Sequence, residues 1–588
     1  MRQFFITVFG TIIGIFAFLF IIMFLLIGLG ISAASSGGTA VKKKQVLSLD
    51  LRIPLRDHSP ASSFFGPQPL SVVEITRALA NAKDDSTVQG LFIRANGIGM
   101  VPASAEEIRL ALEDFKSSGK FVITHAQGFD SPSIMPYHAV SASDEIWQQD
   151  TTGFAVAGLY SETEFYGGVF DKIDAQPQFD QFYEYKNAAN RYTQTDFTPE
   201  HREASTSYLT SLYNNAVAQI AQDRGLSAET LQTTLESAPL SAEAALDAKM
   251  IDKLGQVEDV KAYIRDKVGD EKTPFTPINS YEIDSHLNSP TIAYIGGQGS
   301  VTTGPSADGS NPFIGGGLTM GSDTLAKAFD DAAKDDKVKA IVFRVSSPGG
   351  SPAASDQIYD AVARAQEAGI PVIISMGQYA ASGGYYVSAN ADSIVAMPAT
   401  ITGSIGVLGG KIAFEDSFAK LGYNLEGISI GGDYAGAYSG DTPFNQSQKA
   451  AYHGQLEDIY EDFTNRVSEG RDIPLDRVKD IAKGRVWTGA QAKEIGLVDE
   501  LGGFSKAVDI AKELADIDAD SDVRLKRFPR PKTTAQQIEQ LLGSSAQIQN
   551  DLSTLSDVMA LPEVQAALAL RQKSLIGQEM SAHLPEIK

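Results

Sequence analysis

Cysteine is absent from this sequence of 588 residues, and histidine is scarce. Without cysteine the chain forms no disulfide, offers no thiolate nucleophile and holds no metal ion through sulfur, which excludes the cysteine proteases. Seven histidines occur, none forms an HExxH pair, and none lies between His286 and His453. A Ser-His-Asp triad would need a histidine from a distant part of the chain. The glycines from Gly403 to Gly410 do not match G-x-G-x-x-G, so we expect no dinucleotide or other cofactor, and no metal.

Basic residues are also fewer than acidic residues. The chain has 49 Lys and Arg against 73 Asp and Glu, which gives a formal net charge of −24. Nucleic-acid binding needs clustered Lys and Arg, so this balance argues against a nucleic-acid partner. A solvated acidic surface is the interpretation we favour. The length exceeds what one hydrophobic core supports, and we expect at least two domains.

One long apolar run stands near the amino terminus. No charged residue occurs from Gln3 to Val41, and Phe4 to Leu29 is almost entirely apolar. At about 1.5 Å per residue this run measures roughly 39 Å, enough to cross a ~30 Å hydrocarbon core with some tilt. It exceeds the apolar stretch of a secretory signal peptide, so residues 1–34 predict an uncleaved transmembrane anchor. Lys42-Lys43-Lys44 follow the run while only Arg2 precedes it; the positive-inside rule alone would place the body in the cytoplasm.

The rest of the chain repeats itself at offsets of 250, 248 and 247 residues. The matching pairs are Leu91–Arg94 with Ile341–Arg344, Asp144–Ile146 with Asp392–Ile394, and Ile251–Gly255 with Val498–Gly502. In each copy, apolar runs that read as buried strands alternate with helical stretches, a pattern typical of parallel βαβ units. We expect an α/β fold with two copies of one domain, at residues 45–285 and 286–519. Residues 520–588, with basic residues from Arg524 to Lys532, are expected to be a solvated or peripheral tail.

Two glycine-flanked motifs in the second copy indicate a nucleophile and an oxyanion hole. Ser346-Ser347-Pro348-Gly349-Gly350 and Ala380-Ala381-Ser382-Gly383-Gly384-Tyr385 each follow a buried apolar strand. A turn from strand to helix would expose the Ser382 hydroxyl and place the Gly383 N–H beside it, much as in a nucleophile elbow. The Pro348-Gly349-Gly350 turn would supply a second backbone donor. The alternative is that Ser382 only caps a helix and the glycines only form tight turns.

A serine nucleophile needs a base, and no histidine is near this motif in the sequence. A lysine whose pKa is lowered by apolar burial could take that role. The first copy lacks the nucleophile, because the residue 248 positions before Ser382 is Ile134 and the glycine turn reads Asn96-Gly97-Ile98-Gly99.

These motifs, together with Thr402-Gly403-Ser404-Ile405-Gly406, resemble the long, two-domain form of the signal peptide peptidase A (protease IV) family. These are bacterial inner-membrane serine proteases of the Clp-protease/crotonase superfamily. The resemblance covers about residues 45–515 and the anchor. It implies two tandem Clp-protease/crotonase-like α/β domains behind an N-terminal transmembrane helix. It also implies that the base is the lysine of a Tyr-Lys-x-Ala sequence, which here is Tyr185-Lys186-Asn187-Ala188.

The two copies are complementary in this respect. The counterpart of Lys186 falls near Asp433, in a stretch from Leu425 to Asn445 that contains no lysine. The first copy would therefore supply the base and the second the nucleophile. The resemblance further implies that the Ser404 hydroxyl orients the lysine amine, the alternative being a serine in a glycine turn. The N–H groups of Gly350 and Gly383 would form the oxyanion hole.

We therefore expect a membrane-anchored Ser-Lys endopeptidase that degrades cleaved signal peptides and other apolar peptides. The resemblance implies a homotetramer in the bacterial inner membrane with a periplasmic body, and we prefer it to the Lys42-Lys43-Lys44 signal. Two alternatives share the fold. One is a crotonase-type acyl-CoA enzyme, which leaves the anchor unexplained. The other is a non-catalytic membrane scaffold derived from a protease.

Overall fold

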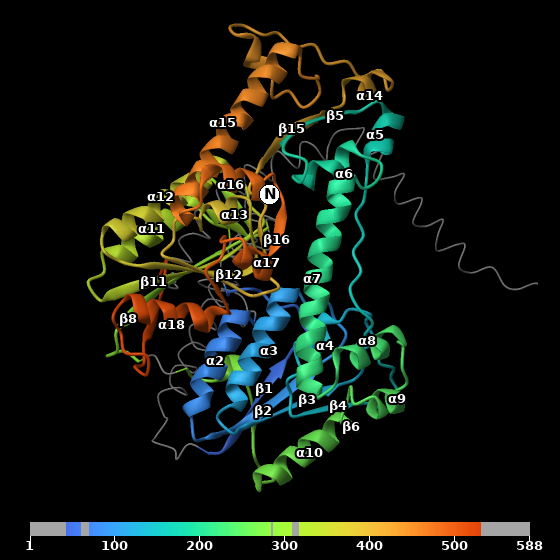
Figure 1. Cartoon of the computed structure of the whole chain (residues 1–588), viewed down its shortest axis with the longest axis vertical. Helices are drawn as coiled ribbons and strands as arrows, with labels where there is room; N and C mark the ends of the chain where they lie inside the picture. Colours follow the sequence, from blue (N-terminus) through green and yellow to red (C-terminus); the bar gives the residue numbers. More distant parts are fainter. Residues whose placement is uncertain (1–42, 60–69, 284–285, 308–316, 531–588) are drawn as a thin grey trace, which may run out of the picture.

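Two mainly parallel β-sheets, one in each half of the chain, form the frame of the molecule (Figure 1). The structure is a computed structural model that describes residues 43–59, 70–283, 286–307 and 317–530. The predicted anchor lies outside these ranges. Among the residues they contain, no helix has the length and apolar character needed to span a membrane.

The first sheet has six strands, and all its neighbouring pairs are parallel. Its order is β6-β4-β3-β2-β1-β7. The strands are β1 (Gln45–Asp50), β2 (Val88–Ala95), β3 (Phe121–Ala126), β4 (Glu145–Gln148), β6 (Lys253–Leu254) and β7 (Phe275–Pro277). Helices α2 (Val72–Asp84) and α3 (Pro102–Lys116) make the crossovers from β1 to β2 and from β2 to β3. The inner strands are apolar runs because helices and loops bury both faces of a parallel sheet.

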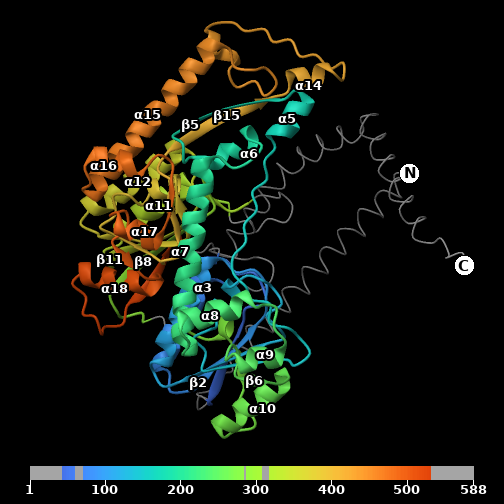
Figure 2. The ribbon, with the colours of Figure 1, turned by 45° about the vertical axis from the view of Figure 1, so that its right-hand side comes forward.

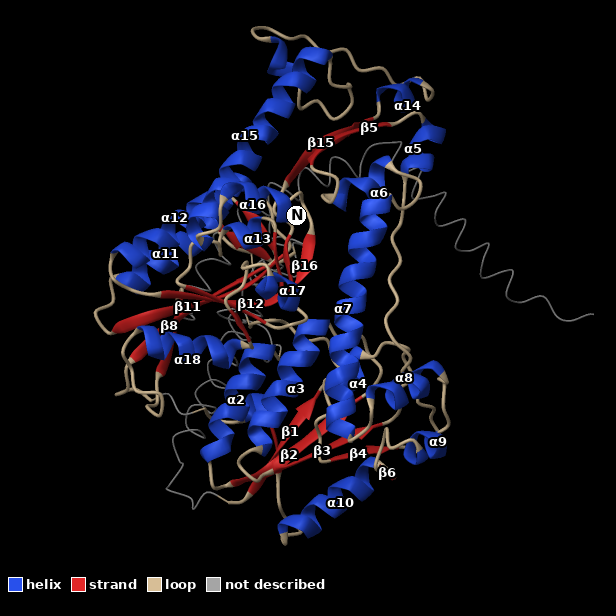
Figure 3. Cartoon of the chain, viewed as in Figure 1, coloured by secondary structure: helices blue, strands red, loops and turns tan. Residues whose placement is uncertain are grey.

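The second sheet repeats this order and adds two strands. Its strands are β8 (Thr291–Gln298), β11 (Val338–Ser347), β12 (Val372–Ala381), β13 (Ser393–Ala396), β14 (Ile401–Gly403), β16 (Val486–Thr488), β17 (Glu500–Leu501) and β18 (Arg524–Phe528). The order β17-β13-β12-β11-β8-β18 corresponds strand by strand to β6-β4-β3-β2-β1-β7. Helices α11 (Ser322–Ala333) and α12 (Pro352–Glu367) take the places of α2 and α3. The parallel α/β architecture that the sequence predicts is therefore present in both halves (Figure 3).

The basic stretch after residue 519 is not peripheral as far as the structure describes it. β18 pairs in parallel with β8, and Phe528 is 1% exposed. β18 is an edge strand, so alternate side chains reach the core while basic ones such as Lys526 meet solvent or Asp335. The basic composition of β18 therefore resembles that of a solvated tail, although the strand belongs to the sheet. Residues 531–588 lie outside the described ranges, and the predicted domain boundaries stay predictions.

Elements that leave the sheets connect the two halves. Helix α7 (Pro199–Arg224) runs from the first half alongside the second, and its Ser211 hydroxyl bonds Thr488 (Figure 2). Strand β5 (Gln176–Phe182) of the first half pairs antiparallel with β15 (Val407–Ala413) of the second. Helix α15 (Gln446–Arg471) packs against both strands. These connections place residues from both halves in one site.

A buried ion cluster also joins the halves. Arg344 on β11 is 1% exposed and donates hydrogen bonds to both carboxylate oxygens of Asp57 and of Glu107, which belong to the first half. Because removal of one partner would leave a buried charge unpaired, this cluster makes the relative position of the halves specific.

Candidate active site

Ser382 occupies a constrained turn at the end of β12. Its backbone has φ 53° and ψ −121°. Residues other than glycine seldom adopt this conformation, and it persists only when neighbouring residues hold it in place. The Ser382 N–H donates to Gly403 O, and its carbonyl accepts from Tyr385 and Tyr386. Ser382 precedes helix α13 (Gly383–Tyr386), but its side chain makes no capping hydrogen bond. The hydroxyl is thus free of the helix-capping role considered as the alternative.

Lys186 reaches this turn through the β5–β15 pairing. Phe182 at the end of β5 lies opposite Val407 at the start of β15. Because the strands are antiparallel, the residues just after Phe182 and just before Val407 leave the ladder at the same end. Lys186 follows Phe182 by four residues, and Ser404 precedes Val407 by three. The pairing therefore brings Lys186 to Ser404.

The three side chains that the sequence predicted to cooperate lie within hydrogen-bond distance. Lys186 Nζ is 3.1 Å from Ser382 Oγ, 3.0 Å from Ser404 Oγ and 2.7 Å from the Ser404 carbonyl oxygen. Lys186 is 5% exposed. Burial lowers the pKa of its amine from 10.5 to about 7, and no charged partner counteracts this effect. A large share of Lys186 is consequently neutral near pH 7.

The glycine turn before α12 and the glycine that follows Ser382 lie close together. A Cβ on Gly349, whose φ is 112°, would stand 2.7 Å from Ser382 Cβ, and one on Gly383 would stand 3.1 Å from the Gly350 nitrogen. Gly383 begins α13, so its N–H has no acceptor within the helix. The Gly349–Gly350 turn is held by Val301, whose N–H donates to Gly349 O and whose carbonyl accepts from Ser351. Both glycine turns thus lie close to the serine, where the predicted oxyanion hole would be.

The corresponding place in the first half has no such chemistry. Ile134 precedes helix α4 (Met135–His138) just as Ser382 precedes α13, and it is fully buried. The Asn96–Gly99 turn after β2 takes the place of Ser347–Gly350. One half carries the serine and the other the lysine, as the repeat predicts.

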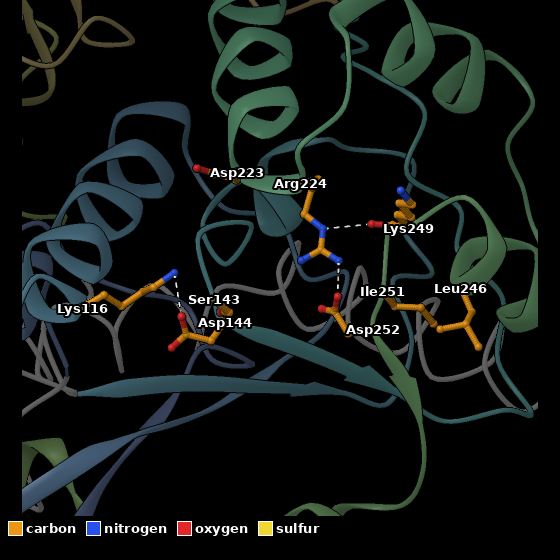
Figure 4. Close-up of a pocket in the computed structure, with 9 residues that line it drawn as sticks. All are labelled: Lys116, Ser143, Asp144, Asp223, Arg224, Leu246, Lys249, Ile251 and Asp252. Carbon is orange, nitrogen blue, oxygen red and sulfur yellow. Dashed lines mark hydrogen bonds and ion pairs between the residues drawn. The ribbon is translucent and has the colours of Figure 1, made fainter. Parts of the chain in front are cut away.

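A polar pocket in the first half has a structural explanation (Figure 4). Arg224 in this cavity of about 460 Å³ pairs with Asp252 at 2.8 Å and donates to Lys249 O. The second half has the equivalent pair of Arg471 and Asp499. A pair that recurs at the same place in both copies belongs to the fold. Among the described residues, no group of His, Asp and Glu side chains could hold a metal ion.

Gly484 is a site residue that the sequence analysis missed. Its φ is +78°, and a Cβ there would stand 2.5 Å from Lys186 Cβ and 2.6 Å from Lys186 N. Only glycine allows the backbone to approach the lysine this closely. The glycine between Lys483 and Arg485 was the available signal, but nothing in the sequence tied it to a residue almost 300 positions earlier.

The sequence matches known proteins along most of its length. The pattern of peptidase family S49 matches residues 114–269 and 364–518, one segment in each half. Protease 4 of Salmonella typhi is 34% identical over 76% of this chain and 72% of its own length. Protease 4 of Haemophilus influenzae is 30% identical over 85% of this chain and 84% of its own. The chloroplastic serine protease SPPA of Arabidopsis thaliana is 28% identical over 90% and 78%.

Proposed function

The chain belongs to peptidase family S49 and is a serine endopeptidase; from that premise we propose that Ser382 is its nucleophile and Lys186 its general base. The observation that carries this proposal is the 3.1 Å separation of Lys186 Nζ and Ser382 Oγ, combined with a lysine pKa of about 7. A base with a pKa near the working pH is unprotonated in a large share of the molecules and is still basic enough to accept the serine proton.

Ser404 gives the neutral amine its direction. A neutral amine has two N–H donors and one lone pair, and the carbonyl and hydroxyl of Ser404 are positioned to accept the two N–H groups. The lone pair is then left for Ser382 Oγ. Lys186 takes the Ser382 proton as Oγ attacks the substrate carbonyl carbon. The new oxyanion receives hydrogen bonds from the N–H groups of Gly350 and Gly383.

Collapse of this intermediate breaks the peptide C–N bond, and the Lys186 ammonium returns its proton to the leaving amine. The product is an ester of Ser382. Lys186, neutral again, removes a proton from a water molecule that attacks the ester carbonyl. The second tetrahedral intermediate expels Ser382 Oγ, which regains the proton from Lys186. No cofactor enters this sequence of steps.

The substrate and the setting follow from the sequence resemblance. We infer that cleaved signal peptides and other apolar peptides are the substrates, because the apolar run Phe4–Leu29 would hold the site beside the membrane where such peptides reside. On the same grounds we infer a crotonase-like fold for each half, a homotetramer, and a periplasmic body anchored in the bacterial inner membrane.

Labelling of the purified protein with a fluorophosphonate, which esterifies activated serines, tests the nucleophile. Mass spectrometry should place the label on Ser382, and Ser382→Ala should abolish both labelling and peptide hydrolysis with an unchanged unfolding midpoint. Lys186→Met should also leave Ser382 unlabelled at neutral pH. A label on another serine, or wild-type hydrolysis by Ser382→Ala, would refute the assignment. An unreactive Ser382 would favour a scaffold, and turnover of acyl-CoA thioesters would favour the crotonase-type enzyme.

A further inference from the structure

A short segment of the second half, residues 482–485, lies against the loop that carries Lys186. We name it the clamp segment. The Lys483 carbonyl accepts hydrogen bonds from the N–H groups of Tyr183 and Tyr185, at 3.4 and 3.2 Å. Gly484 packs its bare Cα against the Lys186 backbone. The clamp segment therefore holds the loop through backbone contacts.

The same segment also holds the Ser404 turn. The Gly484 N–H donates to Ile405 O at 2.8 Å, and the Arg485 carbonyl accepts from the Ser404 N–H at 2.7 Å. Strand β16 continues directly from the clamp segment and pairs with β14, which ends at Gly403. One segment of four residues thus fixes the backbone on both sides of the Lys186 amine.

The side chain of Arg485 ties the clamp segment to the first half. Its guanidinium bonds both carboxylate oxygens of Glu203 on α7 and lies over the ring of Tyr185, with 4.9 Å from Cζ to the ring centroid. It also lies over the Trp487 ring, at 4.5 Å. The Arg485 side chain is 14% exposed and that of Glu203 52%. An ion pair exposed to this extent contributes little to folding stability. The location of the Arg485–Glu203 pair next to the Lys186 loop therefore suggests a role other than stabilising the fold.

We propose that the Arg485–Glu203 ion pair is a positioning device that holds Tyr185 and the clamp segment against Lys186 and keeps water from its amine. Neither side chain contacts the Lys186 amine or Ser382, so both are positioning residues. The inference rests on the proposed role of Lys186 as the base. It adds to that role by identifying the residues that exclude water from the Lys186 amine and direct the amine toward Ser382.

The charged and titratable groups around Lys186 allow a charge effect to be separated from a positioning effect. These groups are Tyr183, Glu184 and Tyr185 on its own loop, Lys483 and Arg485 on the clamp segment, Glu203 on α7, and Tyr460 on α15, whose ring packs against Tyr183. Burial is the only cause that lowers the Lys186 pKa, and none of these charges contributes. Glu203→Gln removes a negative charge and Arg485→Gln a positive one. A direct charge effect would therefore move the Lys186 pKa in opposite directions in the two variants.

Positioning predicts the same direction in both. Loss of either partner frees Tyr185 and admits water, so the lysine pKa should rise in each variant. We expect the midpoint of the ascending limb of kcat against pH to move up by about 0.5–1 pH unit, and kcat at pH 7 to fall about two- to fivefold with KM little changed. The control is Glu184→Gln, the same substitution on the loop that carries Lys186, which breaks the exposed pair with Lys483. It should leave the profile unchanged.

A second measurement does not depend on activity. Competitive acetylation with acetic anhydride across pH, quantified by mass spectrometry at Lys186, reports the pKa of the amine in the wild type and in all three variants. A rise in Glu203→Gln and Arg485→Gln but not in Glu184→Gln supports the proposal. No rise, opposite shifts, or an equal rise in the control overturns it. Full hydrolysis by Lys186→Met would refute the proposed base, whereas the acetylation result would still decide whether the ion pair keeps this amine buried.

Discussion

Lys186 Nζ lies 3.1 Å from Ser382 Oγ, although 196 residues separate the two in the sequence. The pairing of β5 with β15 creates this contact, so each half of the chain holds only part of the proposed dyad. The buried cluster of Arg344, Asp57 and Glu107 fixes the halves relative to each other at a second place. The chemistry of the site is therefore expected to depend on the interface between the halves.

Peptide hydrolysis should rise with pH through about 7. Below the pKa of Lys186 the amine is protonated and cannot take the Ser382 proton, and above it the amine is neutral. Lys186→Met fills the same space without a base and should be inactive across the whole range. The measurement is kcat/KM for a peptide substrate between about pH 5 and 9, which covers about two units on either side of the pKa. A rate independent of pH across this range would argue against a neutral lysine as the base.

Lys186 should also make folding stability depend on pH. Its pKa is about 7 in the folded chain and 10.5 ordinarily. Between these values the unfolded chain binds more protons, so stability should increase as pH rises through this window. Lys186→Met removes the titrating amine, and its stability relative to the wild type should be greatest near pH 6 and decline toward pH 10. The full change is on the order of 3–5 kcal/mol. Urea unfolding at several pH values measures it, and a constant difference would contradict a buried, uncharged lysine.

The sequence predicted the serine, the lysine and the hydroxyl that the structure brings together. Ser382 could be recognised locally, because its glycine-flanked turn follows an apolar strand. Lys186 could not, since a lysine in a polar loop carries no local signal; it required the family motif and the absence of a lysine from the second copy. The sequence did not indicate Gly484, because the lack of space for a Cβ at this position arises only from its tertiary contact with Lys186.

The fold was predictable where strands are buried on both faces. β11 and β12 are apolar runs flanked by glycines, and the repeat indicated that their order recurs in both halves. β5 and β15 gave no such signal, because Gln176–Phe182 is mostly polar and Val407–Ala413 contains two glycines. Their pairing depends on tertiary context. β18 was misjudged for a related reason, since an edge strand with basic side chains has the composition of a solvated tail.

Ser404→Ala should weaken catalysis without abolishing it. The substitution removes one of the two groups that orient the Lys186 amine, while the Ser404 carbonyl remains 2.7 Å from Nζ. We expect kcat to fall by roughly 10²–10³-fold, the range typical for loss of one organising hydrogen bond at an active site. Steady-state kinetics at the pH optimum measure the effect. Unchanged kinetics would reduce Ser404 to a turn residue.

Gly484→Ala should impair catalysis beyond its effect on folding. The added Cβ would meet the Lys186 backbone and Cβ at 2.5–2.6 Å and push the lysine away from Ser382. Gly369→Ala is the matched control, because φ at Gly369 is +80° and a Cβ there meets no atom within 4 Å. Both variants should lose about 1 kcal/mol from the strained backbone. Only Gly484→Ala should lower kcat, by at least tenfold as expected for a displaced base. Equal kinetics in the two variants would show that the close approach does not position Lys186.

Membrane topology is the point where two signals in the sequence disagree. One almost entirely apolar run of 26 residues, Phe4–Leu29, would leave everything after it on a single side, because the sequence has no second such run of 18 or more residues to bring the chain back. If the body is periplasmic, a reporter that is active only outside the cytoplasm should be active when fused after about residue 60. Changing Lys42, Lys43 and Lys44 to Gln should not reduce its activity. A silent reporter that becomes active only in the Gln variant would show that the lysines hold the body in the cytoplasm, and apolar peptides would then have to reach the site from that side.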